Sequence, residues 1–371
     1  MNKLIYVSDI SFPNTSAQAI QILKMCDEFS NKYKVHLLIN NNTQSFKSIK
    51  KNYNLKSIFY IKQLSNDRNI NFFKRINLAM NAFNYFKKIG DDKTIIFSRS
   101  IIASMVFSFF GIKNFLEIHH QNSGLTNIIF KLFRLTKYCN KQYYVLIHKN
   151  LNSHFKFKKE KFIVLDDGVD LKDFKHVQKK NKIKLSCVYT GSFYRGKGIE
   201  FILKLSKLLP NINFYLYGDI STLNKQNLIS IPKNVFFKNY VAYNKIPSIL
   251  SRFKIILMPY SEKVYVKSNS VEVGKYMSPL KLFDYLASGK TLLASRHENY
   301  RHLLKDNYNC YLLNINKIEN WQRLIQKTFF EKSFNKKLLK INVNAVNTAK
   351  KYTWKIRVNK FLKFFKKKQY V

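Results

Sequence analysis

The chain has 371 residues, more than one ordinary hydrophobic core accommodates. Apolar residues make up 46% of it, which excludes wholesale disorder. Lys and Arg number 66 against 21 Asp and Glu, so the net charge is +45. Such a charge attracts nucleic acid, anionic lipid and nucleotide phosphates. An AT-rich genome would produce the same excess of Lys, Asn, Ile, Phe and Tyr, so both explanations of the charge stay open.

The spacing of the cysteines and the lack of recognisable targeting segments predict a cytoplasmic protein. The four cysteines lie far apart and form no metal-site or redox pair, which favours free thiols in a reducing compartment. The N-terminus lacks the charged segment, apolar run and cleavage site of a secretion signal. The longest apolar run, 101–112, is too short to span a bilayer. Binding to the inner face of the cell membrane remains compatible with the charge.

The first half of the chain alternates apolar runs of strand length with helical patterns. Residues 3–10 predict a strand, 17–30 an amphipathic helix and 34–40 a second strand. Strand, helix and strand at this spacing predict a parallel sheet. The same alternation returns at 94–100, 101–111, 114–120, 142–148 and 161–170.

A second α/β series follows a polar, lysine-rich stretch at 177–184, which we interpret as a linker. The second series begins with a strand at 185–192 and a helix at 199–209. Its further predicted elements are 212–219, 234–241, 244–253, 255–261, 276–290, 290–295 and 310–314. The predicted fold class is therefore α/β, with two doubly wound, Rossmann-like parallel-sheet domains facing a central cleft.

One loop of the second domain, "YTGSFYRGKGIE" at 189–200, joins a strand to a helix. Its three glycines let the backbone approach a ligand, and Arg195 and Lys197 supply positive charge. The spacing fits neither the P-loop nor the dinucleotide fingerprint. An ordinary turn with solvated charges remains the alternative.

A second loop leads into the helix predicted within "YMSPLKLFDYLASGK" at 276–290. Ser278 is predicted to cap this helix, Pro279 to occupy its first position and Gly289 to adopt the left-handed conformation after its end. Asp284 lies about one turn inside the helix. It is either a polar residue at the edge of the core or the acceptor for a ligand hydroxyl.

The two loops should converge, because the carboxyl ends of parallel strands lie along one edge of a sheet. They would bring together Arg195, Lys197 and Lys281, with backbone N–H groups near Leu280 and Lys281. This arrangement suits a diphosphate bound without a metal, and Asp284 could then accept hydrogen bonds from both hydroxyls of a ribose. The pattern therefore predicts a nucleotide site.

Three blocks of the second half, 189–219, 234–261 and 276–295, resemble in order and spacing the donor domain of the family-four retaining glycosyltransferases. Residues 162–174 and 352–364 resemble this family's motif at the end of the first domain and its terminal helix. The resemblance covers nearly the whole chain. It implies the GT-B fold, in which two Rossmann-like domains face each other.

The resemblance also implies domain limits and an activity. Residues 1–176 would form the acceptor domain, 185–345 the nucleotide-sugar donor domain, and 346–371 a terminal helix that returns to the first domain. The implied protein transfers a sugar from a nucleotide-sugar to a glycan or lipid-linked acceptor in bacterial surface polysaccharide synthesis, such as lipopolysaccharide or capsule. The nucleotide-sugar is a substrate, and no cofactor or metal is expected.

Three alternatives remain. The chain could be a GT-B nucleotide-sugar epimerase, a degenerate member without activity, or a basic nucleic-acid-binding protein. No helix-turn-helix, RRM or zinc pattern supports the last of these, so we expect no nucleic-acid partner.

Carried over residue by residue, the resemblance assigns Lys197 to the donor diphosphate and His119 to the donor sugar, both in catalytic roles. Asp284 would bind the ribose. The expected donor-binding residues are Arg195, Gly196, Tyr240, Val241, Ser278, Leu280, Lys281 and Asp284, with Tyr240 and Val241 framing the base. The chain departs from the family where Tyr276 replaces the first glutamate of a pair and Ser192 replaces an arginine of the phosphate loop.

His119, at the end of the predicted strand 114–120, could instead be a hydrogen-bonded core residue. Its neighbour His120 complicates the assignment. We expect Glu117 to point to the opposite face of the strand and leave it outside the catalytic set.

Two basic amphipathic segments, 72–88 and the tail 359–371, could contact anionic membrane. Alternatively, both are helices that pack on the domains and expose their lysines to solvent.

Overall fold

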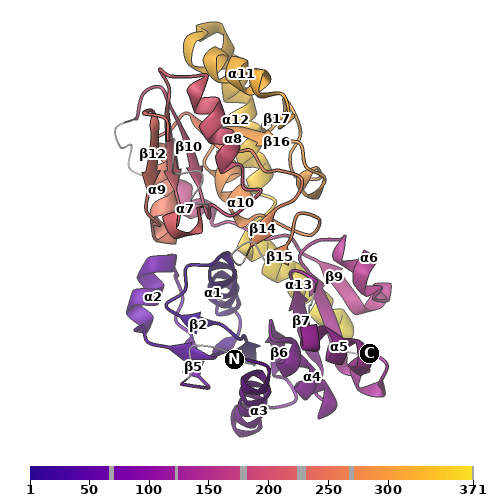
Figure 1. The fold of residues 1–371 in the computed structure, drawn as a ribbon. Helices are drawn as coiled ribbons and strands as arrows, with labels where there is room; N and C mark the ends of the chain where they lie inside the picture. The colour runs from indigo at the N-terminus through magenta and orange to yellow at the C-terminus, as the bar shows by residue number, and fades with distance from the viewer. Residues whose placement is uncertain (67–70, 122–123, 176–181, 224–230, 267–270, 370–371) are drawn as a thin grey trace. The chain divides into compact units, whose positions relative to one another are not determined.

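The computed structural model describes residues 1–66, 71–121, 124–175, 182–223, 231–266 and 271–369. The chain divides into two compact units, each built around a parallel sheet (Figure 1). Unit 1 comprises Met1–Asp166 and Trp354–Val371, and unit 2 comprises Asp167–Thr353. Among the described helices, none is long and apolar enough to cross a membrane.

The sheet of unit 1 has the strand order β5-β3-β1-β6-β7-β8-β9, and all of its pairings are parallel. Its strands are β1 (Lys3–Val7), β3 (Lys34–Ile39), β5 (Tyr60–Gln63), β6 (Ile95–Ser98), β7 (Asn114–Ile118), β8 (Gln142–Leu146) and β9 (Phe162–Val164). The order reverses between β1 and β6, so the sheet is doubly wound. A ligand site in such a sheet lies beyond the carboxyl ends of the strands at this reversal.

Helices cover both faces of this sheet because alternate residues of each strand point to opposite sides. Ile5 and Val7 pack with residues of α3 (Phe72–Ile89) and α4 (Ile101–Phe109). The other helices of unit 1 are α1 (Ala17–Phe29), α2 (Phe46–Tyr53), α5 (Gly124–Phe133), α6 (Leu151–Phe155) and α13 (Trp354–Gln369). A short parallel pair, β2 (Ser11–Phe12) and β4 (Asn41–Asn42), completes the unit.

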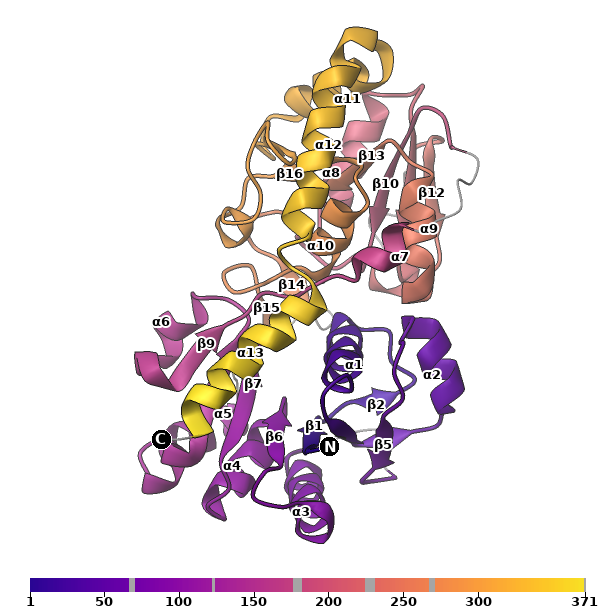
Figure 2. The ribbon, with the colours of Figure 1, turned by 180° about the vertical axis from the view of Figure 1, so that it is seen from behind.

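The C-terminal helix α13 is part of the core of unit 1. Phe361 is fully buried, and its ring centroid lies 4.8 Å from that of Phe97 in β6 and 5.1 Å from that of Phe115 in β7. Figure 2 shows this helix running along the strands of unit 1. Of the two interpretations of the tail, packing on the domain is the one observed, since Phe361 is 0% and Leu362 is 6% exposed.

The sheet of unit 2 repeats the same topology with the order β12-β11-β10-β13-β16-β17, again parallel throughout. Its strands are β10 (Ser186–Thr190), β11 (Asn213–Tyr217), β12 (Val235–Lys238), β13 (Ile255–Met258), β16 (Thr291–Ser295) and β17 (Tyr311–Leu313). The reversal lies between β10 and β13. The two doubly wound sheets confirm the predicted α/β fold class.

The helices of unit 2 are α7 (Leu171–Lys175), α8 (Ile199–Lys207), α9 (Ile246–Ser251), α10 (Leu280–Ala287), α11 (Ile318–Phe330) and α12 (Asn335–Ala349). An antiparallel pair, β14 (Tyr265–Val266) and β15 (Val271–Glu272), follows β13.

The units are divided at positions different from those expected. The first boundary falls at Asp166 rather than at residue 176, because the chain joins unit 2 at once: the Val169 N–H donates to the carbonyl of Tyr352 at 3.0 Å. Most of the expected linker, 177–181, lies outside the described residues. The C-terminal part that belongs to unit 1 begins at Trp354 instead of residue 346, since α12 extends to Ala349.

Candidate functional site

The loop after β10 has a backbone that only glycine tolerates. Gly191, Gly196 and Gly198 have φ values of +129°, +80° and +85°. A Cβ on Gly198 would lie 2.1 Å from the carbonyl oxygen of Pro259, so this position must also be small. Lys197 is held between two left-handed glycines, and α8 begins directly after them. The loop follows β10 at the topological reversal of the sheet.

This loop and the start of α10 bring two lysines together, as the sequence predicted. The Nζ atoms of Lys197 and Lys281 lie 4.8 Å and 5.3 Å from the centroid of the same ring, that of Tyr260. Lys281 Nζ also lies 3.9 Å from the centroid of Tyr189. A Cβ on Gly191 would approach Lys281 Nζ to 2.3 Å, so this glycine leaves room for the ammonium group.

The electrostatics of the lysine pair are unbalanced. Burial lowers the pKa of Lys197 to about 8. Burial, and then the charge of Lys197, lower the pKa of Lys281 well below its usual range. In the described part of the chain, Lys281 Nζ has no hydrogen-bond partner and no carboxylate forms an ion pair with either lysine. Two buried ammonium groups without a counter-charge are unfavourable unless an anion joins them.

The start of α10 differs from the expected one. Pro279, with φ −71° and ψ 111°, is the residue before the helix, and Leu280 is its first residue. Ser278 therefore lies one position too early to cap the helix, and its Oγ accepts instead from the N–H of Asp167 at 3.4 Å. The other end agrees with the prediction, because Gly289 has φ +61° directly after Ser288.

Asp284 is buried inside α10, and its carboxylate has a protein partner. The hydroxyl of Tyr243 donates to Asp284 Oδ1 at 2.9 Å. Burial, and then the charge of Asp284, raise the pKa of Tyr243 well above its usual range. The hydrogen bond accounts for one carboxylate oxygen in the protein itself, so binding of a ribose by Asp284 stays a prediction. The predicted site did not include Tyr243. Because 41 residues separate it from Asp284, no local sequence pattern indicates the contact.

The remaining predicted donor residues lie in the loop after β10 and directly after β12. The guanidinium of Arg195 is exposed and lies 5.2 Å from the ring centroid of Tyr265 in β14. Tyr240 and Val241 follow the carboxyl end of β12, and Tyr240 is 43% exposed. Gly196 supplies the turn before Lys197. Lys197 and Lys281, rather than Arg195, are the cations that share Tyr260.

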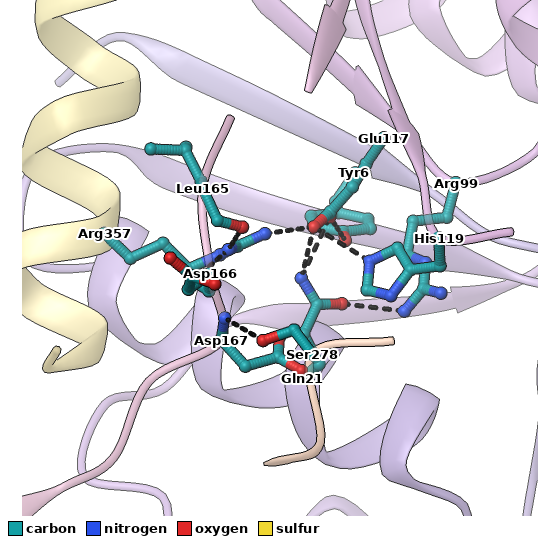
Figure 3. Close-up of polar contacts among 10 residues, drawn as sticks. All are labelled: Tyr6, Gln21, Arg99, Glu117, His119, Leu165, Asp166, Asp167, Ser278 and Arg357. Atoms are coloured by element: carbon teal, nitrogen blue, oxygen red, sulfur yellow. Dashed lines mark hydrogen bonds and ion pairs between the residues drawn. The ribbon is translucent and has the colours of Figure 1, made fainter. Parts of the chain in front are cut away.

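In unit 1, His119 directly follows β7 and contacts Glu117 (Figure 3). His119 Nε2 lies 3.0 Å from Glu117 Oε1, and the imidazole is 17% exposed. The expectation that Glu117 points to the opposite face is wrong. Residues two apart in a strand share a face, so the spacing itself places Glu117 beside His119.

Glu117 is the centre of a buried polar cluster (Figure 3). Gln21 of α1 donates to both carboxylate oxygens at 2.8 and 2.9 Å, and the Tyr6 hydroxyl donates at 3.2 Å. Arg357 of α13 donates one Nη to the carboxylate and the other to the carbonyls of Leu165 and Asp166. We call these residues, with His119 and Arg99, the Glu117 cluster.

The charges of the Glu117 cluster fix the proton on His119. Burial raises the pKa of Glu117, but the charge of Arg357 and the hydrogen bond from His119 outweigh it and hold the pKa below its usual range. Burial, and then the charge of Arg99, lower the pKa of His119 to about 3. The imidazole is therefore neutral at pH 7. Because Nε2 faces an ionised carboxylate, Nε2 carries the proton and Nδ1 can accept a hydrogen bond.

Sequence reasoning missed the partners of His119. The two-residue spacing could have identified Glu117. No sequence signal pairs Glu117 with Arg357, because 240 residues separate them.

A glycine loop at the reversal of a doubly wound sheet, beside two lysines that have no carboxylate partner among the described residues, is typical of proteins that bind an anionic, phosphate-bearing ligand. The comparisons identify the family of the second domain. Residues 170–345 match the family of glycosyl transferases group 1, so this part of the chain is a domain of that family. A curated relative, an uncharacterized glycosyltransferase of Methanocaldococcus jannaschii, is 27% identical over 203 residues, which are 52% of this chain. The match covers 48% of that relative, so the chain spans about half its length.

Solved structures with the same fold match nearly the whole chain. A glycosyltransferase of Rickettsia africae has a TM-score of 0.74 at 14% identity, covering 99% of both chains. Anabaena HepE, solved with UDP and glucose, has a TM-score of 0.69 at 12% identity, covering 98% of both chains. Sucrose-phosphate synthase of Thermosynechococcus elongatus has a TM-score of 0.70 at 12% identity, covering 99% of both chains. The fold is GT-B.

Proposed function

We propose that this protein is a retaining glycosyltransferase that moves a sugar from a nucleotide-sugar to a glycan or lipid-linked acceptor in bacterial surface polysaccharide synthesis. The observation that carries the proposal is the lysine pair at the reversal of the donor-domain sheet: Lys197 is 9% exposed, Lys281 Nζ is buried, and neither has a carboxylate partner among the described residues. A diphosphate supplies the negative charge that this pair needs.

The lysine pair would act on the leaving group. As the bond between the sugar C1 and the diphosphate oxygen breaks, its electron pair remains on that oxygen and negative charge grows there. Fixed positive charge in a buried site stabilises this charge more in the transition state than in the ground state. One lysine lies between two glycines and the other in the first turn of α10. We propose that they make a metal unnecessary.

A front-face substitution fits these residues better than a covalent intermediate. The acceptor hydroxyl would attack C1 on the side from which the diphosphate leaves, and its proton would pass to the leaving phosphate oxygen. The buried carboxylate of Glu117 is engaged by Arg357 and His119, so it does not suit the role of nucleophile. His119 would contact the donor sugar through Nδ1, with Glu117 fixing its orientation.

The nucleoside diphosphate to test first is UDP. Anabaena HepE has been solved with UDP-glucose, and Staphylococcus aureus TarM with UDP. Asp284 would accept hydrogen bonds from the ribose, while Tyr240 and Val241 would frame the base. The proposal includes a cytoplasmic location with attachment to the inner face of the membrane, where a lipid-linked acceptor lies, and no nucleic-acid partner.

A thermal-shift screen against UDP, GDP, ADP and their sugars tests donor binding. A ligand at a hundred times its Kd stabilises the folded protein by about 2.7 kcal/mol, which gives a visible shift. The donor that binds is then incubated with lipid-linked acceptors from a bacterial membrane extract, and the products are followed by mass spectrometry. A product heavier by one sugar, with the anomeric configuration of the donor retained, is expected.

Two results would contradict the proposal. If no nucleoside diphosphate or nucleotide-sugar binds, the proposed donor site is wrong. Interconversion of the free nucleotide-sugar without transfer would favour the epimerase alternative.

A further inference from the structure

The helix α5 of unit 1 has its apolar side turned to solvent. Leu125, Ile128 and Leu132 are 52%, 57% and 60% exposed, and Leu135, just after the helix, is 85% exposed. Their spacings of three, four and three residues place them along one stripe. Phe130, on the opposite side of the helix, is 1% exposed and packs against Tyr144 and Phe155. The helix is thus anchored by one side and presents apolar side chains on the other.

Two aromatic residues extend this surface at the end of α4. Phe109 and Phe110 are 55% and 45% exposed. The ring of Phe109 lies 4.9 Å from that of Tyr138, in the 3₁₀ helix Lys137–Lys141 that follows α5. We name this surface the α5 patch. It consists of Phe109, Phe110, Leu125, Ile128, Leu132 and Leu135.

Basic residues accompany the α5 patch along the chain. Between residues 109 and 141 the chain has five basic residues: Lys113, Lys131, Arg134, Lys137 and Lys141. The one acidic residue in this stretch, Glu117, is buried and paired with Arg357. Lys113 and Lys161 also lie together over the ring of Tyr143, 6.0 and 4.5 Å from its centroid.

We propose that the α5 patch docks the protein on an anionic membrane surface. Aliphatic side chains can enter the boundary between headgroups and acyl chains, while the lysines remain at the level of the lipid phosphates. Nucleic acid would satisfy the cations but leave the exposed leucines in water. A second copy of this chain, bound through the same patch, would place two sets of basic residues against each other. The combination of apolar and basic side chains favours anionic lipid.

The proposal moves the membrane contact away from both segments that the sequence suggested. The apolar residues Phe361 and Leu362 of α13 are in the core. In α3, Leu78, Ala79, Ala82 and Phe83 pack inward. The inference rests on the proposed function for its purpose, because a lipid-linked acceptor lies at such a surface. Its test needs no sugar transfer, so the two can fail separately.

The test is flotation of the full chain with phosphatidylcholine vesicles, with and without phosphatidylglycerol, at low and high salt. The wild-type protein is expected to float only with the anionic vesicles and to be released by high salt. The variant Ile128→Asp/Leu132→Asp should reduce vesicle affinity at least about tenfold, because each buried aliphatic side chain is worth more than a factor of ten. Lys131→Gln/Lys137→Gln should reduce it too, by about fivefold per lysine.

The matched control is Leu339→Asp/Val343→Asp on α12. These two aliphatic residues have the same four-residue spacing and are 65% and 58% exposed, but they lie in unit 2. The control should float like the wild type, and all variants should unfold at the wild-type temperature.

Several outcomes overturn the proposal. Wild-type protein that does not float with anionic vesicles does so directly. Equal losses in the α5 variant and the α12 control would mean a general effect of charge. A concentration-dependent dimer that the α5 variant abolishes, without vesicle binding, would assign the patch to a second copy. In each case, unchanged UDP affinity would leave the proposed function standing.

Discussion

The two units each bury a group of charged side chains, and the two groups differ in balance. In unit 1 the carboxylate of Glu117 is matched by Arg357 and further held by Gln21, Tyr6 and His119. In unit 2 Lys197 and Lys281 share the ring of Tyr260 but have no carboxylate partner among the described residues. The carboxylate of the first group has an ionic partner within the protein, whereas the lysines of the second have none among the described residues.

This difference separates two kinds of buried charge. A paired and hydrogen-bonded ion can hold neighbouring groups in place, but its removal leaves an uncompensated charge. An unpaired buried cation weakens the folded state and remains available for an anion. We therefore interpret the Glu117 cluster as a device that positions His119, and the lysine pair as a binding site. Four experiments test this distinction.

The largest effect is expected from Arg357→Met. It leaves the Glu117 carboxylate buried without its ionic partner and should lower the free energy of unfolding of unit 1 by about 3–5 kcal/mol, as measured by urea denaturation. The double variant Arg357→Met/Glu117→Gln should recover much of this loss, because no charge is left unpaired. The exposed neighbour Lys355→Met is the control and should remain within about 0.5 kcal/mol of wild type. Wild-type stability of Arg357→Met would show that the cluster is not the balanced group described.

The opposite pattern is expected from Lys281→Met. Removing an unpaired buried ammonium should leave stability unchanged or raise it, whereas affinity for the nucleoside diphosphate should fall by about 1.5–3 kcal/mol, the range for hydrogen bonds to charged groups. Titration calorimetry and thermal unfolding measure the two quantities. The control is Lys290→Met. Lys290 lies just beyond the other end of α10, and its Nζ, unlike that of Lys281, has a protein partner, because it donates to the carbonyl of Ser251. A loss of stability with unchanged affinity would assign Lys281 to the core.

A smaller effect is expected from pH. The pKa of Lys197 is lowered to about 8, so the free protein loses this proton as pH rises above about 8. Diphosphate affinity should then fall, by at most about tenfold per pH unit for this one proton. Stability should move the other way: between about pH 8 and the ordinary lysine pKa near 10.5 the unfolded chain binds the extra proton, so stability rises with pH.

Lys197→Met should lose both of these trends, which calorimetry across this pH range can measure. If affinity in the wild type stays level through the range, Lys197 does not contact the anion.

The smallest expected change concerns His119. With a pKa lowered to about 3, its imidazole should remain neutral, with the proton on Nε2, from pH 5 to 8. Nitrogen-15 NMR of labelled histidine should therefore show one set of shifts that does not titrate, assigned by its absence in His119→Gln. In Glu117→Gln the fixed tautomer should be lost, and turnover should fall more than donor affinity. Titration of wild-type His119 near its ordinary pKa of about 6.5 would refute the burial and pairing described.

Much of the fold follows from local sequence patterns. The predicted strand 3–10 contains β1, the helical pattern 17–30 contains α1, and 34–40 contains β3, with the parallel pairing inferred from their alternation. The convergence of Lys197 and Lys281 also followed from this alternation, because parallel strands end along one edge. The wrong placement of Glu117 was an error in applying the two-residue period, since the sequence contained the information.

Other errors had no local signal. Ser278 and Pro279 make a plausible cap and first turn, but the extended backbone at Pro279 starts the helix one residue later than the motif suggests. The tail 359–371 has the composition of a membrane-binding helix, but its residue Phe361 packs against Phe97 and Phe115. Composition alone does not distinguish an apolar side that has a partner from one, like that of α5, that is exposed.

Local sequence specifies what depends on neighbours along the chain: the strands and helices, their parallel order, the glycine loop after β10 and the two lysines at its edge. Tertiary structure decided what depends on distant residues. It joined Arg357 to Glu117, Tyr243 to Asp284 and Lys281 to Gly191. The physical reason is range: periodicity acts over a few residues, whereas the balance of a buried charge depends on whichever side chains the completed fold brings within a few ångströms.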